Sequence, residues 1–183
     1  MNKLPLDFTI NKYGLTARFV KVEDASLIVQ MRTNPQLSKY LHKTSASIDE
    51  QINWINKYKE REALGSDYYF AFSIENVIYG FERIYNITED YFTHGSLIFS
   101  ENSPLGMSVL ADIITREIGF DMLDMKFNYF DVRKKNLSVI NYHKRYKPEL
   151  ISEDDDNLYF KLSKENFISN KNKYLHLFLK NVL

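Results

Sequence analysis

The sequence predicts a single α/β domain of the α+β kind, in which helices flank a central, twisted, mixed β-sheet. Three consecutive strand-like runs, at residues 68–74, 77–85 and 91–99, are joined by short connections that favour antiparallel hairpins. A helix and a further strand follow, and a helical crossover of this kind places its two strands parallel. With 183 residues and 44% hydrophobic content, the chain can bury one substantial core.

The N-terminal part is expected to hold a strand and then a helix. Residues 14–21 are typical of a strand, and Asp24 is the expected N-cap of a helix whose apolar residues recur through residues 25–31. Pro35 ends this helical pattern, because proline lacks an amide donor and disfavours a helical residue before it.

Two longer helices are expected in the middle of the chain. Ser47 and the three residues after it match a capping box, so a helix should run from there to just before Gly65. The longest helical pattern covers residues 105–122 and has one broad apolar stripe. Ser103 and Pro104 are expected to start it, since serine caps helices and proline is tolerated in a first turn.

The C-terminal part alternates between strands and helices. A strand at residues 126–132 precedes a helix over residues 136–146, and a last strand at residues 159–162 follows an acidic run at residues 153–156. We interpret the acidic run as a solvated hairpin turn.

One domain is predicted over residues 1–165, because the chain shows no internal repeat and no linker. Residues 166–183 alternate polar and apolar residues in a way that suits a short amphipathic helix. This C-terminal tail is expected to pack on the domain or on a partner copy, which leaves a homodimer open.

The charge balance limits the classes of partner. Twenty-four Lys and Arg residues offset twenty-four Asp and Glu residues, so no overall positive field attracts nucleic acid or an anionic membrane. No apolar stretch approaches the roughly 20 residues that span a bilayer. We therefore predict a cytoplasmic protein with a small-molecule or peptide partner, and neither a nucleic-acid nor a membrane partner.

Several reaction classes lack their motifs. Cysteine is absent, which excludes disulfides, thiolate nucleophiles and cysteine metal sites. The sequence contains no Walker loop, no HExxH and no Gly-x-Ser-x-Gly, so nucleotide hydrolysis, zinc proteolysis and serine hydrolysis have no support. We predict that the site uses no metal.

Four segments resemble the GNAT acetyltransferase superfamily. Residues 15–25 (LTARFVKVEDA) are similar to the start of the branch that contains ribosomal-protein and nucleotide-amino-sugar N-acetyltransferases. Residues 32–35 (RTNP) and 51–55 (QINWI) resemble two further segments of that branch. Residues 135–144 (KNLSVINYHK) resemble the helix after the family's fifth strand. The order of the elements, over about residues 15–162, resembles the GNAT fold as well.

The resemblance implies that acetyl-CoA is the co-substrate. In this family two adjacent parallel strands splay at a bulge, and free amides of one strand then face the thioester. Leu97, Ile98 and Phe99 would supply that strand, with side chains that pack in the core. Asn136 would contact the cofactor and also cap its helix. The pyrophosphate would bind at the loop before the long helix, through Ser103, Leu105, Gly106, Met107 and Ser108.

The loop at residues 103–108 also suits an anion on physical grounds. A helix N-terminus offers unpaired amides and the positive end of the helix dipole. The corresponding loop of the family has more small residues, whereas Gly106 is the only glycine here. The alternative interpretation is a loop that only starts a helix.

Three residues are candidates for proton transfer. The resemblance implies that His143 donates the proton to the leaving thiolate, a role that suits a side chain with a pKa of about 6.5. Glu82 and His94 are candidates for the general base, with Glu82 slightly preferred because a charge on a central strand needs a partner. The alternatives are an exposed His143, a solvated Glu82, a turn residue at His94, and a water chain as the base.

Arg18, Arg32 and Tyr40 are candidates for the acceptor site between the first helices and the sheet, since arginine recognises phosphate and carboxylate groups well. Surface salt bridges are the alternative role for the arginines. The resemblance implies transfer of an acetyl group from acetyl-CoA to a primary amine, on an amino sugar linked to a nucleotide and used in cell-surface polysaccharide synthesis. The alternatives are acetylation of a protein N-terminus and a non-catalytic binding module with an altered phosphate loop.

Overall fold

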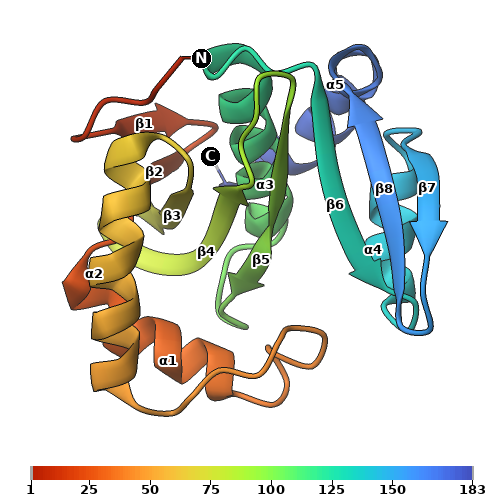
Figure 1. The fold of residues 1–183 in the computed structure, drawn as a ribbon. Coiled ribbons are helices and arrows are strands. Elements are labelled where there is room, and N and C mark those ends of the chain that lie inside the picture. Colours follow the sequence, from red (N-terminus) through yellow and green to blue (C-terminus); the bar gives the residue numbers. More distant parts are fainter. Residues whose placement is uncertain (1, 183) are drawn as a thin grey trace.

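The computed structural model describes residues 2–182, and within them helices cover both faces of one eight-stranded sheet (Figure 1). The strand order is β1-β2-β3-β4-β5-β6-β8-β7. The strands are β1 (Thr9–Lys12), β2 (Leu15–Phe19), β3 (Tyr68–Ile74), β4 (Val77–Tyr85), β5 (Tyr91–Phe99), β6 (Phe127–Arg133), β7 (Glu149–Glu153) and β8 (Asn157–Ser163). The helices are α1 (Ala25–Thr33), α2 (Ile48–Leu64), α3 (Met107–Glu117), α4 (Leu137–Lys144) and α5 (Lys164–Val182), with a 3-10 turn (Val22–Asp24) and a π-helical turn (Ile118–Met122).

The predicted mixed sheet is confirmed. Strands β3, β4 and β5 form antiparallel hairpins, and β5 and β6, which flank the α3 crossover, are parallel. The remaining neighbouring strands pair antiparallel. The acidic run lies at the turn between β7 and β8, where its residues are exposed, as expected for a solvated hairpin turn.

The two faces of the sheet bury different sets of residues, and β3 shows this most clearly. Tyr68, Phe70 and Phe72 belong to the larger core, which includes residues of α3 and α5. Tyr69 and Ala71 belong to the smaller core, which includes residues of α1 and α2. Side chains of a strand alternate between its two faces, so β3 is packed on both.

The sequence pattern missed β1, an edge strand whose residues are exposed or only partly buried. It pairs with β2 through a tight turn at Tyr13 and Gly14, whose φ angles are 55° and 77°. Two central residues at positive φ match the twist of a short hairpin. The Tyr13 hydroxyl donates a hydrogen bond of 2.8 Å to Glu117 Oε1, which ties this turn to α3.

The N-caps expected for α1 and α2 have different outcomes in the structure. Ser47 caps α2 as predicted, and its hydroxyl accepts a hydrogen bond of 3.2 Å from the Glu50 amide. Asp24 occupies the N-cap position of α1, but its side chain does not cap that helix. Its carboxylate accepts from the Lys21 amide instead, at 2.8 Å, and closes the 3-10 turn before α1.

Helix α3 begins later than the sequence pattern predicted. Its first residue is Met107, and its N-cap is Gly106, with a φ of 85°. The prediction that Ser103 caps the helix is wrong, because the helix starts four residues later and no side chain caps it. The Ser103 amide donates to the Ser100 carbonyl in a separate turn, at 3.0 Å. Leu105, expected in the buried stripe, is 74% exposed in this loop.

The C-terminal helix α5 follows β8 directly and packs against α3. Phe167, Tyr174 and Leu175 of α5 are buried in the larger core. The division of the chain at residue 165 and contact of the tail with a second copy stay predictions. Across residues 2–182, no helix combines the length and the apolar character needed to cross a bilayer.

Candidate active site

Strands β5 and β6 run side by side only at their first residues. The parallel pairing joins residues 91–93 to residues 127–129, and beyond it the strands separate (Figure 1). A bulge in β5 accompanies the separation, because Ser96 and Leu97 together oppose Glu82 of β4 and Ser96 has a φ of 59°. A bulge bends its strand. The splayed strand pair expected from the resemblance is therefore present.

A cavity of about 170 Å³ lies between the separated strands, and we name it the strand cavity. It is lined by residues of β4, β5, β6, α3 and α4 and of the connection between α1 and α2. Many of the predicted site residues line it, namely Glu82, His94, Leu97, Asn136, His143, Arg32 and Tyr40. The fold thus brings all three candidates for proton transfer to one place.

Five ionisable side chains meet at the strand cavity, and we name them the buried charge cluster. They are Glu82, His94, Asp112, Arg116 and His143, and none is more than 6% exposed. His94 Nε2 lies 3.9 Å from Glu82 Oε1 and 3.2 Å from Asp112 Oδ1, the latter without an aligned hydrogen bond. Arg116 Nη2 lies 3.4 Å from Asp112 Oδ1 and also 3.4 Å from His94 Nε2.

The two carboxyl groups of the cluster have opposite protonation states. Burial, and then the charge of Asp112, raise the pKa of Glu82 well above its usual value. Burial opposes ionisation of Asp112 too, but Arg116 and then His94 outweigh it and hold the pKa of Asp112 below its usual value. Two neighbouring carboxyl groups do not both ionise in a buried site. Glu82 is therefore the neutral acid and Asp112 the carboxylate.

Both histidines of the cluster are neutral. Burial, and then the charge of Arg116, lower the pKa of His94 and lower the pKa of His143 further. Asp112 partly opposes the shift at each histidine. His94 Nδ1 is buried without a hydrogen-bond partner. The surface position considered for His143 and the turn position considered for His94 are both wrong, because the two side chains are 6% and 5% exposed.

Sequence reasoning missed four members of this site. Asp112 and Arg116 lie one helical turn apart on α3, where every residue from 110 to 117 is buried. Thr115 donates a hydrogen bond of 2.7 Å to Glu82 Oε2, and Tyr142 donates one of 2.6 Å to Asp112 Oδ2. Opposite charges at this spacing pair on a helix, and a charged pair inside an apolar stripe is the signal that could have found them.

A cation is a second way to fill the site. Ligand atoms of Glu82, His94 and Asp112 all lie within 4.8 Å of one another. Arg116, however, already supplies positive charge 3.4 Å from Asp112 Oδ1, which weakens the attraction of this site for a metal ion. We interpret the cluster as a site that handles protons, and the absence of a metal from the reaction stays a prediction.

Some of the residues predicted for cofactor binding on β5 and at the start of α4 line the strand cavity, and others pack in the core. Leu97 lines the strand cavity, whereas the side chains of Ile98 and Phe99 pack in the smaller and the larger core. Asn136 lines the cavity at the start of α4, but its side chain does not cap that helix. Asn136 Oδ1 accepts a hydrogen bond of 3.2 Å from the Ser138 hydroxyl instead.

At the loop of residues 103–108, some amides at the start of α3 make no hydrogen bond to a backbone carbonyl. The Met107 amide donates to the Pro104 carbonyl at 3.0 Å, and the Leu110 amide donates the first α-helical bond, to the Gly106 carbonyl at 3.0 Å. The amides of Ser108 and Val109, which lie between them, are not bonded to a backbone carbonyl. Gly106 has a further structural role, since a Cβ there would collide with the ring of Phe178 on α5. Met107 is fully buried in the larger core. Of the loop, backbone amides and the side chains of Ser103 and Ser108 are therefore the groups suited to a phosphate.

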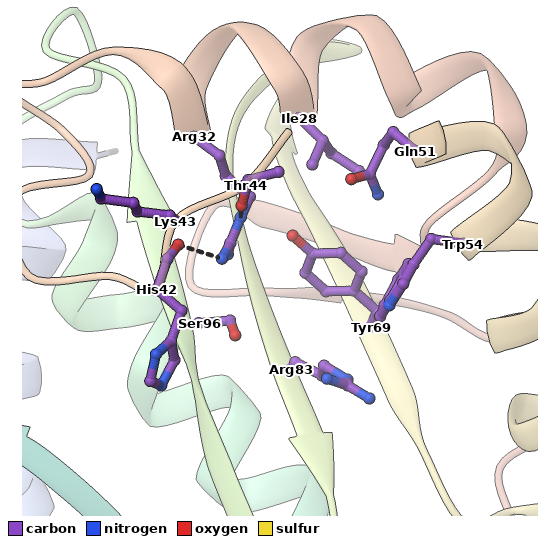
Figure 2. Close-up of a pocket in the computed structure, with 10 residues that line it drawn as sticks. All are labelled: Ile28, Arg32, His42, Lys43, Thr44, Gln51, Trp54, Tyr69, Arg83 and Ser96. Carbon is purple, nitrogen blue, oxygen red and sulfur yellow. Dashed lines mark hydrogen bonds between the residues drawn. The ribbon is translucent and has the colours of Figure 1, made fainter. Parts of the chain in front are cut away.

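A second cavity, of about 340 Å³, lies between α1, α2 and the sheet, and we name it the helix cavity (Figure 2). It shares Arg32, His42 and Ser96 with the strand cavity, so the two cavities adjoin. Among the described residues that line it, none is acidic. They are Ile28, Arg32, His42, Lys43, Thr44, Gln51, Trp54, Tyr69, Arg83 and Ser96.

Arg32 is held in place by neutral groups. Its Nε donates to the Thr44 hydroxyl at 2.6 Å, and its Nη2 donates to the His42 carbonyl at 3.3 Å. Figure 2 shows the Arg32 guanidinium and the Tyr69 hydroxyl directed toward the same space. Within residues 2–182, no carboxylate forms an ion pair with Arg32 or with Lys43.

A second arginine adds to the positive wall of the helix cavity. Arg83 pairs with the buried carboxylate of Asp67 and lies 5.2 Å from the centroid of the Trp54 ring. The same carboxylate pairs with Arg61, at 2.9 Å. One carboxylate thus serves two guanidinium groups, and the wall keeps a net positive charge.

The remaining two candidates for the acceptor site are placed differently. Tyr40 lines the strand cavity and donates a hydrogen bond of 3.2 Å to the Lys135 carbonyl, which ties the α1–α2 connection to the start of α4. Arg18 lines neither cavity. It forms a two-bond ion pair with Asp24, both bonds 2.8 Å long, so its role is the salt bridge considered as the alternative.

A mixed sheet with one splayed parallel pair, a polar cluster buried at the splay and a second cavity beside it match the class of protein that the sequence resemblance implied. Comparisons with protein-family models and with curated proteins found no match. Among solved structures, FdhC, a nucleotide-linked sugar GNAT, is 31% identical, with 92% of this chain and 97% of that chain covered and a TM-score of 0.82. The chain belongs to the GNAT acetyltransferase superfamily.

More distant structures share the fold. A ribosomal-protein-S5-alanine acetyltransferase from Vibrio fischeri is 16% identical over 88% of this chain and 99% of that chain, with a TM-score of 0.73. A spermidine N-acetyltransferase from Vibrio cholerae, solved with CoA and spermine, is 14% identical over 86% and 99% of the two chains, with a TM-score of 0.73. At these identities the likeness concerns the fold alone.

Proposed function

We propose that this chain is an N-acetyltransferase that moves the acetyl group of acetyl-CoA to a primary amine on a sugar linked to a nucleotide. The observation that carries the proposal is the helix cavity, a positive and partly aromatic space without acidic lining residues, which adjoins the buried charge cluster. Phosphate groups of a nucleotide pair well with arginine. The 31% identity to a nucleotide-linked sugar GNAT supports the same class of acceptor.

The acyl donor has suitable surroundings at the strand cavity. Beyond residue 93, β5 lacks the parallel neighbour β6, so its backbone is free to bond an extended pantetheine chain. The amides that begin α3 suit the pyrophosphate, because a helix N-terminus attracts anions. Leu97 and Asn136 line the space between these two positions in the proposal.

The proton leaves the amine through His94 in this proposal. The acceptor arrives as an ammonium group, and neutral His94 takes its first proton. The freed nitrogen attacks the thioester carbonyl, the new C–N bond forms and the C–S bond breaks. The thiolate then takes a second proton from the attacking nitrogen, which leaves an amide and a free thiol. Glu82 already holds its proton, so we prefer His94 to Glu82 as the base.

Two measurements test the proposal. Thermal stability is measured with and without acetyl-CoA, and a ligand at 100 times its dissociation constant should stabilise the fold by about 2.7 kcal/mol. Release of free thiol is then followed with nucleotide-linked amino sugars, the matching free amino sugars, and peptides with a free N-terminus. We expect the fastest release with the nucleotide-linked sugars. Absence of stabilisation would indicate a non-catalytic module, and faster release with peptides would indicate a protein acetyltransferase.

A further inference from the structure

Arg116 lies at the centre of the buried charge cluster and has no part in the reaction proposed above. It is fully buried, with its guanidinium carbon 5.2 Å from the centroid of the Phe130 ring and 4.9 Å from that of Tyr146. Its charged partner is Asp112, at 3.4 Å. A buried guanidinium is costly unless its charge and its donors are used. The contacts of Arg116 therefore call for a functional explanation.

The contact between Arg116 and His143 determines where the His143 proton lies. Arg116 Nη2 is 2.8 Å from His143 Nδ1. A guanidinium has donors and no acceptor, so Nδ1 must carry the lone pair. A neutral imidazole has one N–H group, and the proton of His143 is therefore on Nε2.

The surroundings of His143 also oppose a second proton on its ring. Protonation would place a cation 2.8 Å from the Arg116 guanidinium, among side chains that are almost completely buried. Asp112 is the one ionised acid of the cluster, and its two oxygens already face Tyr142 and the pair formed by His94 and Arg116. Several groups face His143 from the packed elements. They are Arg116 and Asp112 of α3, His94 of β5, Phe130 of β6 and Tyr142 of α4 itself.

The Nε2 edge of His143 is open to the strand cavity. His143 lines that cavity, and its Nε2 is not among the buried atoms that lack a partner. The N–H group fixed by Arg116 is therefore available to a molecule in the cavity.

We infer that Arg116 is a positioning residue that holds His143 neutral with its proton on Nε2, so that His143 gives the reacting thioester a hydrogen bond and keeps its proton. The part of this inference that concerns the thioester rests on the proposed function. A neutral imidazole can polarise a carbonyl in this way. His143 thereby changes from the proton donor that the resemblance implied to a donor of a hydrogen bond to the developing oxyanion.

Nuclear magnetic resonance of the free enzyme tests the protonation state directly. Protein with ¹⁵N-labelled histidine side chains is titrated from pH 6 to pH 8, and His143 is assigned by its loss in His143→Gln. We expect a hydrogen on Nε2, none on Nδ1, and no titration of His143 across this range. A hydrogen on Nδ1, or a transition near the ordinary pKa of about 6.5, would overturn the inference.

Substitution of Arg116 tests whether this residue is the cause. Arg116→Met is combined with Asp112→Asn, because removal of both charges leaves no unpaired buried ion. In the folded double variant we expect His143 to populate both neutral forms and to titrate closer to pH 6.5. An unchanged Nε2 form would show that Arg116 does not fix it. Arg116→Lys, whose ammonium group also has donors and no acceptor, should keep the Nε2 form and is the control. If the double variant does not fold, the resonances and the titration of His143 in the wild type still test the inference.

Kinetics separate a hydrogen bond from a proton transfer. His143→Phe removes the N–H donor and should lower kcat by about 10²-fold to 10³-fold, as for loss of one oxyanion donor. His143→Gln keeps an N–H donor that cannot transfer its proton, and it should recover most of that loss. Equal losses in the two variants would identify a true proton donor and overturn the inference. If the wild-type enzyme acetylates no acceptor, the proposed function fails, while the resonance experiment still decides the state of His143.

Discussion

The strand cavity and the helix cavity adjoin at Arg32, His42 and Ser96, yet they differ in how they treat charge. At the strand cavity, the ionised pair Asp112 and Arg116 balances internally, beside a neutral acid and two neutral imidazoles. The helix cavity, in contrast, is lined by cationic side chains, and one buried carboxylate, that of Asp67, pairs with both Arg83 and Arg61. A balanced interior lets a proton move at little electrostatic cost, whereas uncompensated positive charge attracts an anionic ligand.

One strand builds both environments. Glu82 and Arg83 are neighbours on β4, and Glu82 lines the strand cavity while Arg83 lines the helix cavity. Successive side chains of a strand point to opposite faces, so adjacent residues can serve the reaction on one side and recognition on the other. The difference between the cavities thus follows in part from the side chains of β4, which point alternately to the two faces of the sheet.

The largest expected effect distinguishes the two candidates for the base. His94→Gln removes the proposed proton acceptor and should lower kcat by about 10²-fold to 10⁴-fold. Glu82→Gln should lower kcat by less than about tenfold, which corresponds to about 1.4 kcal/mol, because glutamine is neutral like the protonated acid. Initial rates of thiol release at saturating substrates provide the measurement, with His176→Gln on the exposed face of α5 as control. A larger loss in Glu82→Gln than in His94→Gln would restore Glu82 as the base.

A smaller effect tests the positive wall of the helix cavity. Arg32→Met should raise the KM for a nucleotide-linked acceptor by about tenfold to a hundredfold, the value of one or two charge-assisted hydrogen bonds, with little change in kcat. The matching free amino sugar should show no such change. Arg145→Met removes an exposed arginine outside both cavities and is the matched control. An equal rise of KM for both acceptors would show that Arg32 does not bind the nucleotide part of the acceptor.

The smallest effect concerns stability against pH. Burial and Asp112 raise the folded-state pKa of Glu82 above its ordinary value, so its stabilising contribution is complete below about pH 4.5 and is lost as pH rises through the folded-state pKa. Glutamine does not titrate. As pH rises within this window, the free energy of unfolding of Glu82→Gln should therefore increase relative to that of the wild type by about 1.4 kcal/mol per pH unit. Denaturant titrations at pH 5, 6 and 7 measure the difference, and a constant difference would contradict a neutral Glu82.

The candidate site was partly predictable from local sequence. Glu82, His94 and His143 lie on three separate elements, and the element order with the resemblance was enough to name them. Their mutual contacts were not predictable, because they arise from a bulge at Ser96 and from the packing of α3 against the sheet. Arg18 was assigned to the acceptor site because arginine suits phosphate, but a carboxylate six residues away accepts from both its Nη1 and its Nη2.

By itself, the sequence determined the mixed sheet, the order of the strands and helices that follow β1, and the three titratable residues of the strand cavity. These follow from period-two and helical spacings and from turn residues, which are local properties. The tertiary structure decided which of those residues hold protons. Arg116 and Asp112 change the protonation of Glu82, His94 and His143 only because folding buries them within a few ångströms of one another, where charges interact strongly.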